Sequence, residues 1–357
     1  MCPLLQRIAK MVLRRKDVFN RKEVGFYHIT TRCVRQAFLL GEDFKSESNN
    51  HHRKAWIEQW FQSLTEVMAI EICAYAIMDN HTHSILRNRP DWLEGMDDYE
   101  VATRLARLYP GYQCLGSLPT EADPVRVQEI LQDRERFAKR KEKLADISMF
   151  MARWEEAVAR RANKEDGSAG RFWEGRFYCQ RLLDPAAVLA ATIYVELNPL
   201  RANIVDLPEF TQFTSLTNRL NLIKVSSGEF PEYLTRNSAM QESFNRLESM
   251  ALGRAKVNNI QLCEKFLPVD TIKYLRVLDY VAGKDSLMKN AQSDESVHDI
   301  LVRLGVTPQR WRQTAIEFER SYKLFAGSPE MLAAIASAQK KRCIHGVSTA
   351  NQVYLVN

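Results

Sequence analysis

The fold is decided by residues 74–86, which read AYAIMDNHTHSIL. Residues 69–78 are apolar and predict a buried strand, Asp79-Asn80 predicts a tight turn, and residues 81–87 predict a second strand. His81 and His83 occupy alternate positions of that second strand. Alternate side chains of a strand point to the same face, so both imidazoles lie within reach of one metal ion. Two partly exposed histidines beside a turn are the competing interpretation.

The residues before this stretch predict one more strand and one helix. Residues 25–31, GFYHITT, are aromatic and β-branched, which is typical of a strand. Residues 50–68 carry apolar side chains at the spacing of one helix face, namely Trp56, Ile57, Trp60, Phe61 and Leu64. The resulting β-α-β-β order is the first part of a ferredoxin-like β-α-β-β-α-β unit. We therefore expect an α+β fold with a ferredoxin-like catalytic domain.

The rest of the chain is mostly helical in character. Residues 90–170 are highly charged and predict one or two exposed helices inserted into the domain. Residues 177–183 predict a fourth strand, and Asp184-Pro185 is typical of a helix start, with the helix ending at Pro199. Residues 226–357 predict a helical C-terminal region. We expect two parts, a catalytic domain over residues 1–225 and a helical region of unknown role over residues 226–357.

Composition and charge limit the class of protein. The chain has 357 residues, 45% of them hydrophobic and 26% charged, as in globular proteins, and it contains no long apolar run. The seven cysteines are dispersed without a CxxC pair, which favours reduced thiols and a cytoplasmic protein. The net charge is +6, and residues 1–40 hold nine Lys or Arg against Asp17 and Glu23. A concentrated basic segment is compatible with a polyanionic partner.

A second candidate group lies in residues 194–199, YVELNP. On a helix, Tyr194 and Asn198 are four residues apart and share one face. A tyrosine hydroxyl can form a covalent intermediate, and an asparagine oxygen is a neutral ligand suited to Mg²⁺ or Mn²⁺. The competing interpretation is a core aromatic residue and a helix-ending asparagine.

The two groups together resemble a known family. YAIMDNHTHSIL resembles the HUH motif, in which a bulky hydrophobic residue separates two histidines, although Thr82 stands at that position here. IYVELNPLRANIV resembles the tyrosine-helix motif of the single-tyrosine HUH transposases. Within that superfamily, GFYHITTRCVRQAFLLGEDF and RFWEGRF resemble further segments of the REP-associated tyrosine transposases. The resemblance covers residues 20–215, is interrupted near residues 90–170, and leaves the region beyond residue 226 unexplained.

The resemblance implies a chemistry. Tyr194 would be the nucleophile, and His81, His83 and Asn198 would bind Mg²⁺ or Mn²⁺. The phenol would cleave single-stranded or hairpin-bearing DNA without ATP, leaving a 5′-phosphotyrosine that a 3′-hydroxyl can later attack. A metal-bound water, His28 and Glu196 are candidates to take the phenol proton, with Glu196 expected on another helix face and His28 expected to be structural. The family includes monomers and dimers, so a homodimer stays open.

DNA contacts are expected from basic and aromatic side chains around these motifs. The candidates are six arginines, namely Arg32, Arg35, Arg171, Arg176, Arg181 and Arg201. Phe172, Trp173 and Phe177 are interleaved with them, which suits stacking on unpaired bases, with core packing as the alternative.

Two other classes of protein share some of these features. A metal-dependent hydrolase barrel also uses an HxH motif, but it needs further histidines and a series of βα repeats. Only His298 and His345 follow His83, and no βα series is present. The remaining alternative is a non-catalytic or host-regulatory nucleic-acid-binding protein descended from a transposase.

Overall fold

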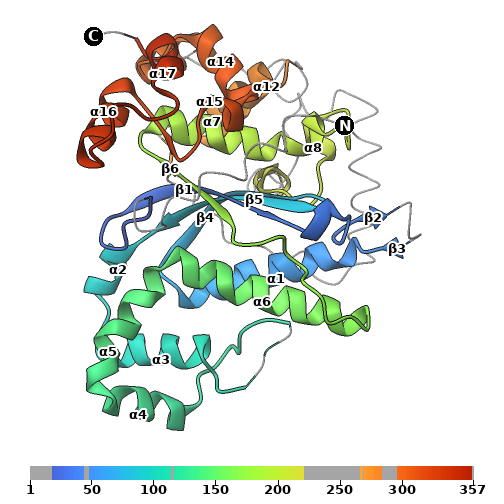
Figure 1. The fold of residues 1–357 in the computed structure, drawn as a ribbon, viewed down its shortest axis with the longest axis vertical. Helices are drawn as coiled ribbons and strands as arrows, with labels where there is room; N and C mark the ends of the chain where they lie inside the picture. The colour runs from blue at the N-terminus through green and yellow to red at the C-terminus, as the bar shows by residue number, and fades with distance from the viewer. Residues whose placement is uncertain are drawn as a thin grey trace.

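A five-stranded sheet forms the centre of the protein (Figure 1). The computed structural model describes residues 18–43, 48–112, 114, 116–220, 266–267, 269–283 and 296–355. In spatial order the strands are β4 (Ile70–Ile77), β5 (His81–Asn88), β1 (Gly25–Arg32), β6 (Tyr178–Leu182) and β7 (Phe325–Ala326). The first four are antiparallel to their neighbours, and β7 is parallel to β6. The α+β class is confirmed, and the predicted strands are present at their expected places.

The turn between β4 and β5 is held from both sides. Met78 N–H donates to the His81 carbonyl at 2.9 Å, which closes the turn. The carbonyls of Asp79 and Asn80 accept from Leu40 N–H and Cys33 N–H, both at 2.9 Å. These bonds fix the first residue of β5 and therefore the direction of its side chains.

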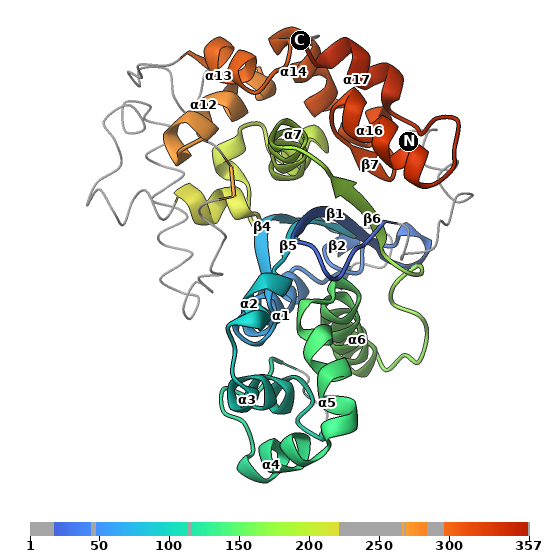
Figure 2. The same ribbon diagram turned by 90° about the vertical axis from the view of Figure 1, so that its left-hand side faces the viewer.

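Helices cover both faces of the sheet (Figure 2). On one face lie α1 (His52–Val67) and α6 (Ile147–Glu165), which pack against each other. On the other face lies α7 (Pro185–Glu196), and the C-terminal helices cover its outer side. Of the twelve residues of α7, all except Pro185 are buried, which a helix on an open surface would not allow.

The start of α7 follows the sequence signal. The Asp184 side chain accepts from Ala187 N–H at 2.8 Å, and Pro185 stands in the first turn. The end differs, because α7 stops at Glu196 and a short second helix, α8 (Asn198–Arg201), follows with Pro199 in its first turn. Proline is tolerated there because the first amides of a helix have no internal partner.

The insert between β5 and β6 contains more helices than expected, and one of them is buried. It comprises α2 (Pro90–Glu94), α3 (Asp98–Leu108), α4 (Pro124–Gln132), α5 (Arg134–Lys141), the short 3₁₀ helix η4 (Glu142–Ala145) and α6. Phe150, Trp154 and Val158 of α6 are buried against α1, with the Trp154 and Phe61 rings 5.5 Å apart. The expectation of exposed helices was wrong for α6 because its many charged residues occupy only the outer face.

The C-terminal region is helical, as expected, but it also contributes β7. Its described helices are α12 (Thr271–Ala282), α13 (Val297–Arg303), α14 (Pro308–Ile316), α15 (Phe318–Ser321), α16 (Pro329–Ala338) and α17 (Val347–Val353). They share one hydrophobic core with α7, where Trp311 Nε1–H donates to the Ala186 carbonyl at 3.1 Å. The expected boundary at residues 225/226 and the basic residues 1–17 lie outside the described residues. No helix in the described part is long and apolar enough to cross a membrane.

A half-buried carboxyl group on α1, that of Glu58, predicts a pH-dependent stability. Tyr75 Oη donates to Glu58 Oε1 at 2.9 Å, and burial raises the Glu58 pKa to about 7. In the unfolded chain the Glu58 carboxyl group ionises near pH 4.5. Ionised Glu58 therefore destabilises the folded state relative to the unfolded state above pH 7, and this destabilisation is absent below pH 4.5. Glu58→Gln should therefore raise the free energy of unfolding by about 2 kcal/mol more at pH 8 than at pH 5, measured by urea titration.

Glu135→Gln, on the exposed side of α5, is the control and should give the same small change at both pH values. An equal effect of Glu58→Gln at pH 5 and pH 8 would contradict this account.

Candidate active site

Both histidines of β5 point to the sheet face that α7 covers. In the β1–β5 ladder Thr30 lies opposite His83, and Arg32 lies opposite His81. Directly opposed residues share a face, so these four side chains belong to one surface. The His81 and His83 rings meet edge to face, with centroids 4.9 Å apart. The structure therefore brings the two imidazoles together.

Neighbouring side chains hold the Nδ1 atom of each ring. His81 Nδ1 lies 2.6 Å from Asn80 Oδ1. His83 Nδ1 lies 3.0 Å from His28 Nε2 and 3.2 Å from Thr30 Oγ1. Metal-binding histidines usually have one ring nitrogen held by such a partner, which orients the other toward the ion. This arrangement leaves the two Nε2 atoms as ligands.

Burial keeps these imidazoles neutral near pH 7. The His81 pKa is lowered to about 4, mainly by burial and then by the positive charge of Arg32. The His83 pKa is also lowered, mainly by burial and then by its histidine neighbours. Neutral imidazole is the form that binds a metal ion, so no proton has to leave before binding at neutral pH.

Tyr194 lies over the histidines from the side of α7. Its ring centroid is 5.8 Å from that of His83 and 5.9 Å from that of His28. The Arg201 guanidinium stands 4.3 Å from the centre of the tyrosine ring. The hydroxyl accepts a hydrogen bond from Arg201 and donates one to Glu319. Burial, followed by the charge of Glu319, raises the Tyr194 pKa to about 12, so the phenol is protonated at neutral pH.

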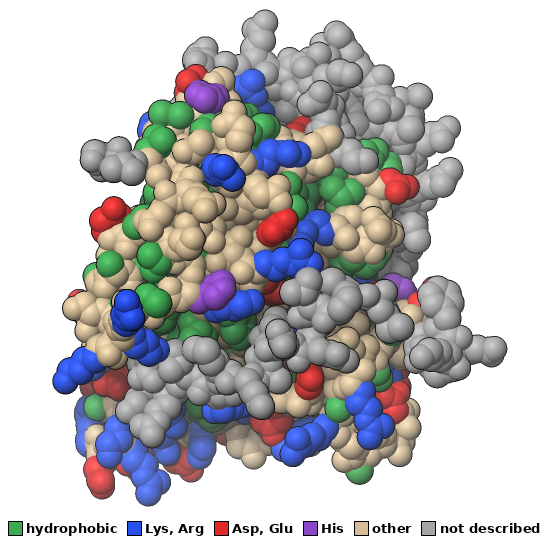
Figure 3. All heavy atoms as spheres, turned by 45° about the horizontal axis from the view of Figure 1, so that its top comes forward, with side chains coloured by type: hydrophobic (Ala, Val, Ile, Leu, Met, Phe, Trp, Pro, Cys, Tyr) green, Lys and Arg blue, Asp and Glu red, His purple; other side chains and the backbone are tan. Residues whose placement is uncertain are grey.

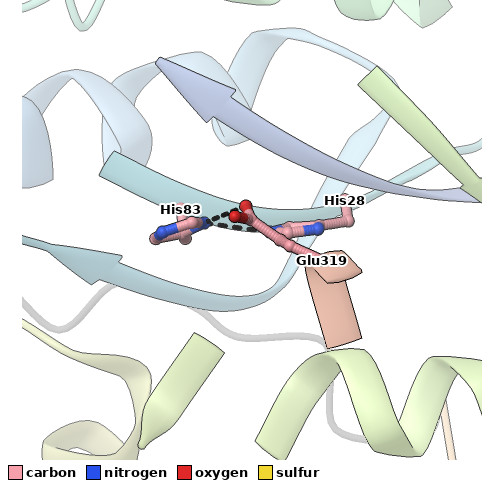
Figure 4. A group of neighbouring side chains, drawn as sticks. All are labelled: His28, His83 and Glu319. Carbon is pink, nitrogen blue, oxygen red and sulfur yellow. Dashed lines mark hydrogen bonds and ion pairs between the residues drawn. The ribbon is translucent and has the colours of Figure 1, made fainter. Parts of the chain in front are cut away.

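Glu319 enters the site from the C-terminal region, on α15 (Figure 4). Its Oε1 accepts from Thr30 Oγ1 at 3.3 Å and lies 3.7 Å from His83 Nδ1. His28, His83 and Glu319 each offer a ligand atom within 4.8 Å of the others, so this group could hold a divalent ion. No sequence signal points to Glu319, which follows Tyr194 by 125 residues in the region that no motif covers.

Asn198 lies beside the first histidine. Its side chain hydrogen-bonds His81 and is largely buried. Asn198 begins α8 and does not continue α7, yet it reaches His81 because α8 follows α7 after a single residue. One mostly buried group therefore contains Tyr194, His81, His83 and Asn198, and His28 and Glu319 also belong to it.

Among solved structures, the chain is similar to a REP-associated tyrosine transposase bound to a REP hairpin. The alignment has 14% sequence identity, covers 58% of this chain and 82% of that chain, and has a TM-score of 0.30. No family model matches the chain, and no curated protein matches it. The assignment of a function therefore depends on the geometry of the site.

The six expected DNA-binding arginines have different surroundings. Arg32 and Arg201 lie at the histidine–tyrosine group, where their charges lower the His83 pKa. Arg181 is partly buried and pairs with Glu23 at 3.1 Å. The remaining three, Arg35, Arg171 and Arg176, are exposed, and the structure gives them no contact with this group among the described residues. Basic and acidic side chains are mixed along the lower edge of the face in Figure 3, so surface charge alone does not mark a DNA path there.

The aromatic residues expected to stack on bases belong to the core. Phe172 and Phe177 are buried against the α1–α6 side of the sheet. Trp173 is half-buried, and its Nε1–H donates to the Glu155 carbonyl at 2.8 Å. Stacking on bases was the wrong interpretation for the two phenylalanines. The same alternation of arginines and aromatic residues occurs where a loop packs its aromatic rings into the core and exposes its arginines.

Glu196 lies on another face of α7, as expected. Its carboxylate accepts from Arg219 Nε at 2.9 Å, Tyr274 Oη at 2.6 Å and Ser215 Oγ at 2.5 Å. Both of its oxygens are engaged away from Tyr194, so Glu196 is not placed to take the phenol proton.

Proposed function

We propose that this chain is a metal-dependent single-stranded DNA endonuclease and strand transferase of the HUH single-tyrosine type. The observation that carries the proposal is the approach of the Tyr194 ring to His83, with Asn198 at His81. These groups come from segments about 110 residues apart in the chain. A phenol, two neutral imidazoles and a carboxamide are the side chains that this chemistry requires.

The proposed fold of the catalytic part supports this function. The order β4-β5-β1-β6 with antiparallel neighbours fits a ferredoxin-like unit, in which α1 and α6 are the two crossover helices. We propose that residues 1–225 form this catalytic part, and that the C-terminal region completes the site with Glu319.

In the proposed reaction the Tyr194 oxygen attacks the phosphorus atom of a DNA strand. The phosphorus–O3′ bond breaks, the O3′ atom takes a proton, and the 5′ phosphate stays on Tyr194. One phosphate ester replaces another, so a later 3′-hydroxyl can reverse the step without ATP. Arg201 contacts the tyrosine hydroxyl and would balance the charge of the phosphate. Glu319 accepts the hydroxyl hydrogen bond and would take the proton.

The donor set fits a divalent ion. His81, His83 and Asn198 would hold Mg²⁺ or Mn²⁺ through the two Nε2 atoms and the amide oxygen. When bound, such an ion neutralises phosphate charge and orients the phosphate for in-line attack. The group His28, His83 and Glu319 is a second set that shares His83. We favour the first set because His28 already holds His83 Nδ1 at 3.0 Å.

The proposal is tested by covalent trapping. The full chain, Mn²⁺ and labelled hairpin-bearing single strands are incubated and run on a denaturing gel. We expect a shifted, protease-sensitive band that is absent with Tyr194→Phe and present with Tyr99→Phe, an exposed tyrosine of α3. DNA binding without any adduct, across many single strands, would support the non-catalytic alternative instead.

Glu319→Gln separates the role of base from that of metal ligand. The amide keeps the shape of the side chain but cannot take the Tyr194 proton. We expect single-turnover cleavage to fall about 100-fold while Mn²⁺ affinity, measured by calorimetry, stays within about threefold. Glu317→Gln, two residues earlier, is the control and should change neither quantity. A parallel loss of Mn²⁺ affinity in Glu319→Gln would favour the set that contains His28.

A further inference from the structure

The helical insert and α1 line a partly open cavity that the proposed chemistry does not use. Its volume is about 390 Å³, within the ~300–1,000 Å³ range of small-molecule sites. Its walls come from the helices α1, α4 and α6 and from the loop that follows α3. All of these lie on the side of the sheet opposite α7 (Figures 1 and 2). The lining includes three aromatic residues and three arginines, namely Trp60, Tyr109, Tyr112, Arg126, Arg153 and Arg160.

Arg153 lines this cavity beside the ring of Tyr109. Its side chain is half-buried, and its guanidinium carbon lies 5.4 Å from the centre of the Tyr109 ring. Among the described residues no carboxylate pairs with it, and its buried Nε–H has no acceptor. The other two arginines differ, because Arg126 pairs with Glu129 at 2.8 Å and Arg160 pairs with Glu156. A half-buried cation without a partner is costly, which points to an anion supplied from outside the chain.

A second donor in the same wall also has no acceptor in the described part of the chain. Trp60 is 1% exposed, and its Nε1–H has no acceptor among the described residues. Buried donors in folded proteins are nearly always hydrogen-bonded, so two such donors beside one cavity are unusual. Both nitrogen atoms are covered in this state, so a ligand would reach them after a small movement of the side chains.

The walls combine positive charge with aromatic faces. Among the described lining residues, three arginines stand beside one acidic residue, Glu156, and Arg153 is the arginine that no described carboxylate pairs. Tyr109 lies under the Arg153 guanidinium, and Tyr112 is 65% exposed. Arginine binds phosphate in a forked geometry, and tyrosine rings stack on flat bases. The chemistry that matches both features is a phosphate joined to an aromatic base.

We propose that this cavity binds a nucleotide, with its phosphate at Arg153 and its base against Tyr109. The nucleotide is either a free mononucleotide or an unpaired nucleotide of a DNA strand. The site is separate from Tyr194 and requires no cleavage, so it stands or falls independently of the proposed reaction.

Calorimetry with the full-length protein carrying Tyr194→Phe tests the site without strand cleavage. The probes are a mixture of deoxynucleoside 5′-monophosphates, inorganic phosphate and a short single-stranded oligonucleotide. We expect Arg153→Gln to weaken nucleotide affinity at least about tenfold, and Tyr109→Leu to weaken binding of nucleotides but not of phosphate. Arg136→Gln, an exposed arginine of the same insert, removes the same charge and should change affinity less than twofold.

A second measurement locates the ligand even if Arg153→Gln is poorly folded. Bromodeoxyuridine oligonucleotides are photo-crosslinked to the unaltered cavity, and the labelled peptide is identified by mass spectrometry. If the oligonucleotide labels residues 109–112 or the peptide that contains Trp60, the cavity binds a nucleotide of a DNA strand. If only free bromodeoxyuridine monophosphate labels these residues, the cavity binds a mononucleotide. The proposal would be overturned if Arg153→Gln and Arg136→Gln bound nucleotides with equal affinity, or if phosphate bound as tightly as a nucleotide. It would also be overturned if the label appeared only near Tyr194.

Discussion

Replacing His83 by alanine should abolish the proposed metal-dependent DNA cleavage. His83 stands at the centre of the site, where it contacts His28, Thr30 and the ring of Tyr194. It belongs to both candidate ligand sets, so its removal takes one nitrogen ligand from either. We expect Mn²⁺ affinity to fall at least about 100-fold and single-turnover cleavage at least about 1,000-fold, because the charge on the phosphate is no longer neutralised. Calorimetry measures the affinity, and adduct formation over time measures the rate.

His298→Ala is the matched control, because His298 is exposed on α13. It should leave affinity and rate unchanged. Cleavage by His83→Ala at more than a tenth of the original rate, in a normally folded protein, would exclude His83 from the reaction.

Replacing Glu196 by alanine should strongly destabilise the folded protein. Glu196 is fully buried, and its carboxylate joins α7 to Tyr274 of α12 and to Arg219. Its removal leaves the Arg219 guanidinium in the interior without its counter-ion. Breaking a buried ion pair from one side costs about 3–5 kcal/mol, and we expect a loss of that size in the free energy of unfolding. Urea titration followed by circular dichroism measures it.

Glu174→Ala, at an exposed position, should cost less than about 0.5 kcal/mol in the same experiment. Glu196→Gln keeps two of the hydrogen bonds and should be folded well enough for cleavage to be measured. If Glu196→Gln lost cleavage without losing stability, Glu196 would have a direct role in the reaction, contrary to its position in the structure.

The elements that position the candidate site could be predicted from local sequence patterns. The apolar strand before Asp79-Asn80 and the Asp184-Pro185 helix start depend on neighbouring residues alone, and β4, β5 and α7 lie where these signals put them. The same is true of the shared face of His81 and His83, because strand periodicity fixes it.

The remaining parts depend on contacts between distant segments. Glu319 reaches Thr30 and Tyr194 only because the C-terminal helices pack on α7, and no local pattern encodes that packing. The role of His28 as the partner of His83 Nδ1 required the β1–β5 register. The burial of α6 was missed because composition over a long window hid an apolar stripe of Phe150, Trp154 and Val158.

Anomalous diffraction from crystals soaked in Mn²⁺ tests the central claim most directly. We expect one strong peak about 2.2 Å from the Nε2 atoms of His81 and His83 and close to the Asn198 amide oxygen, with the Tyr194 hydroxyl facing the ion. A peak among His28, His83 and Glu319 would replace the proposed ligand set. The absence of any peak at His83, in crystals where Mn²⁺ binds elsewhere, would contradict a metal-dependent reaction at this site.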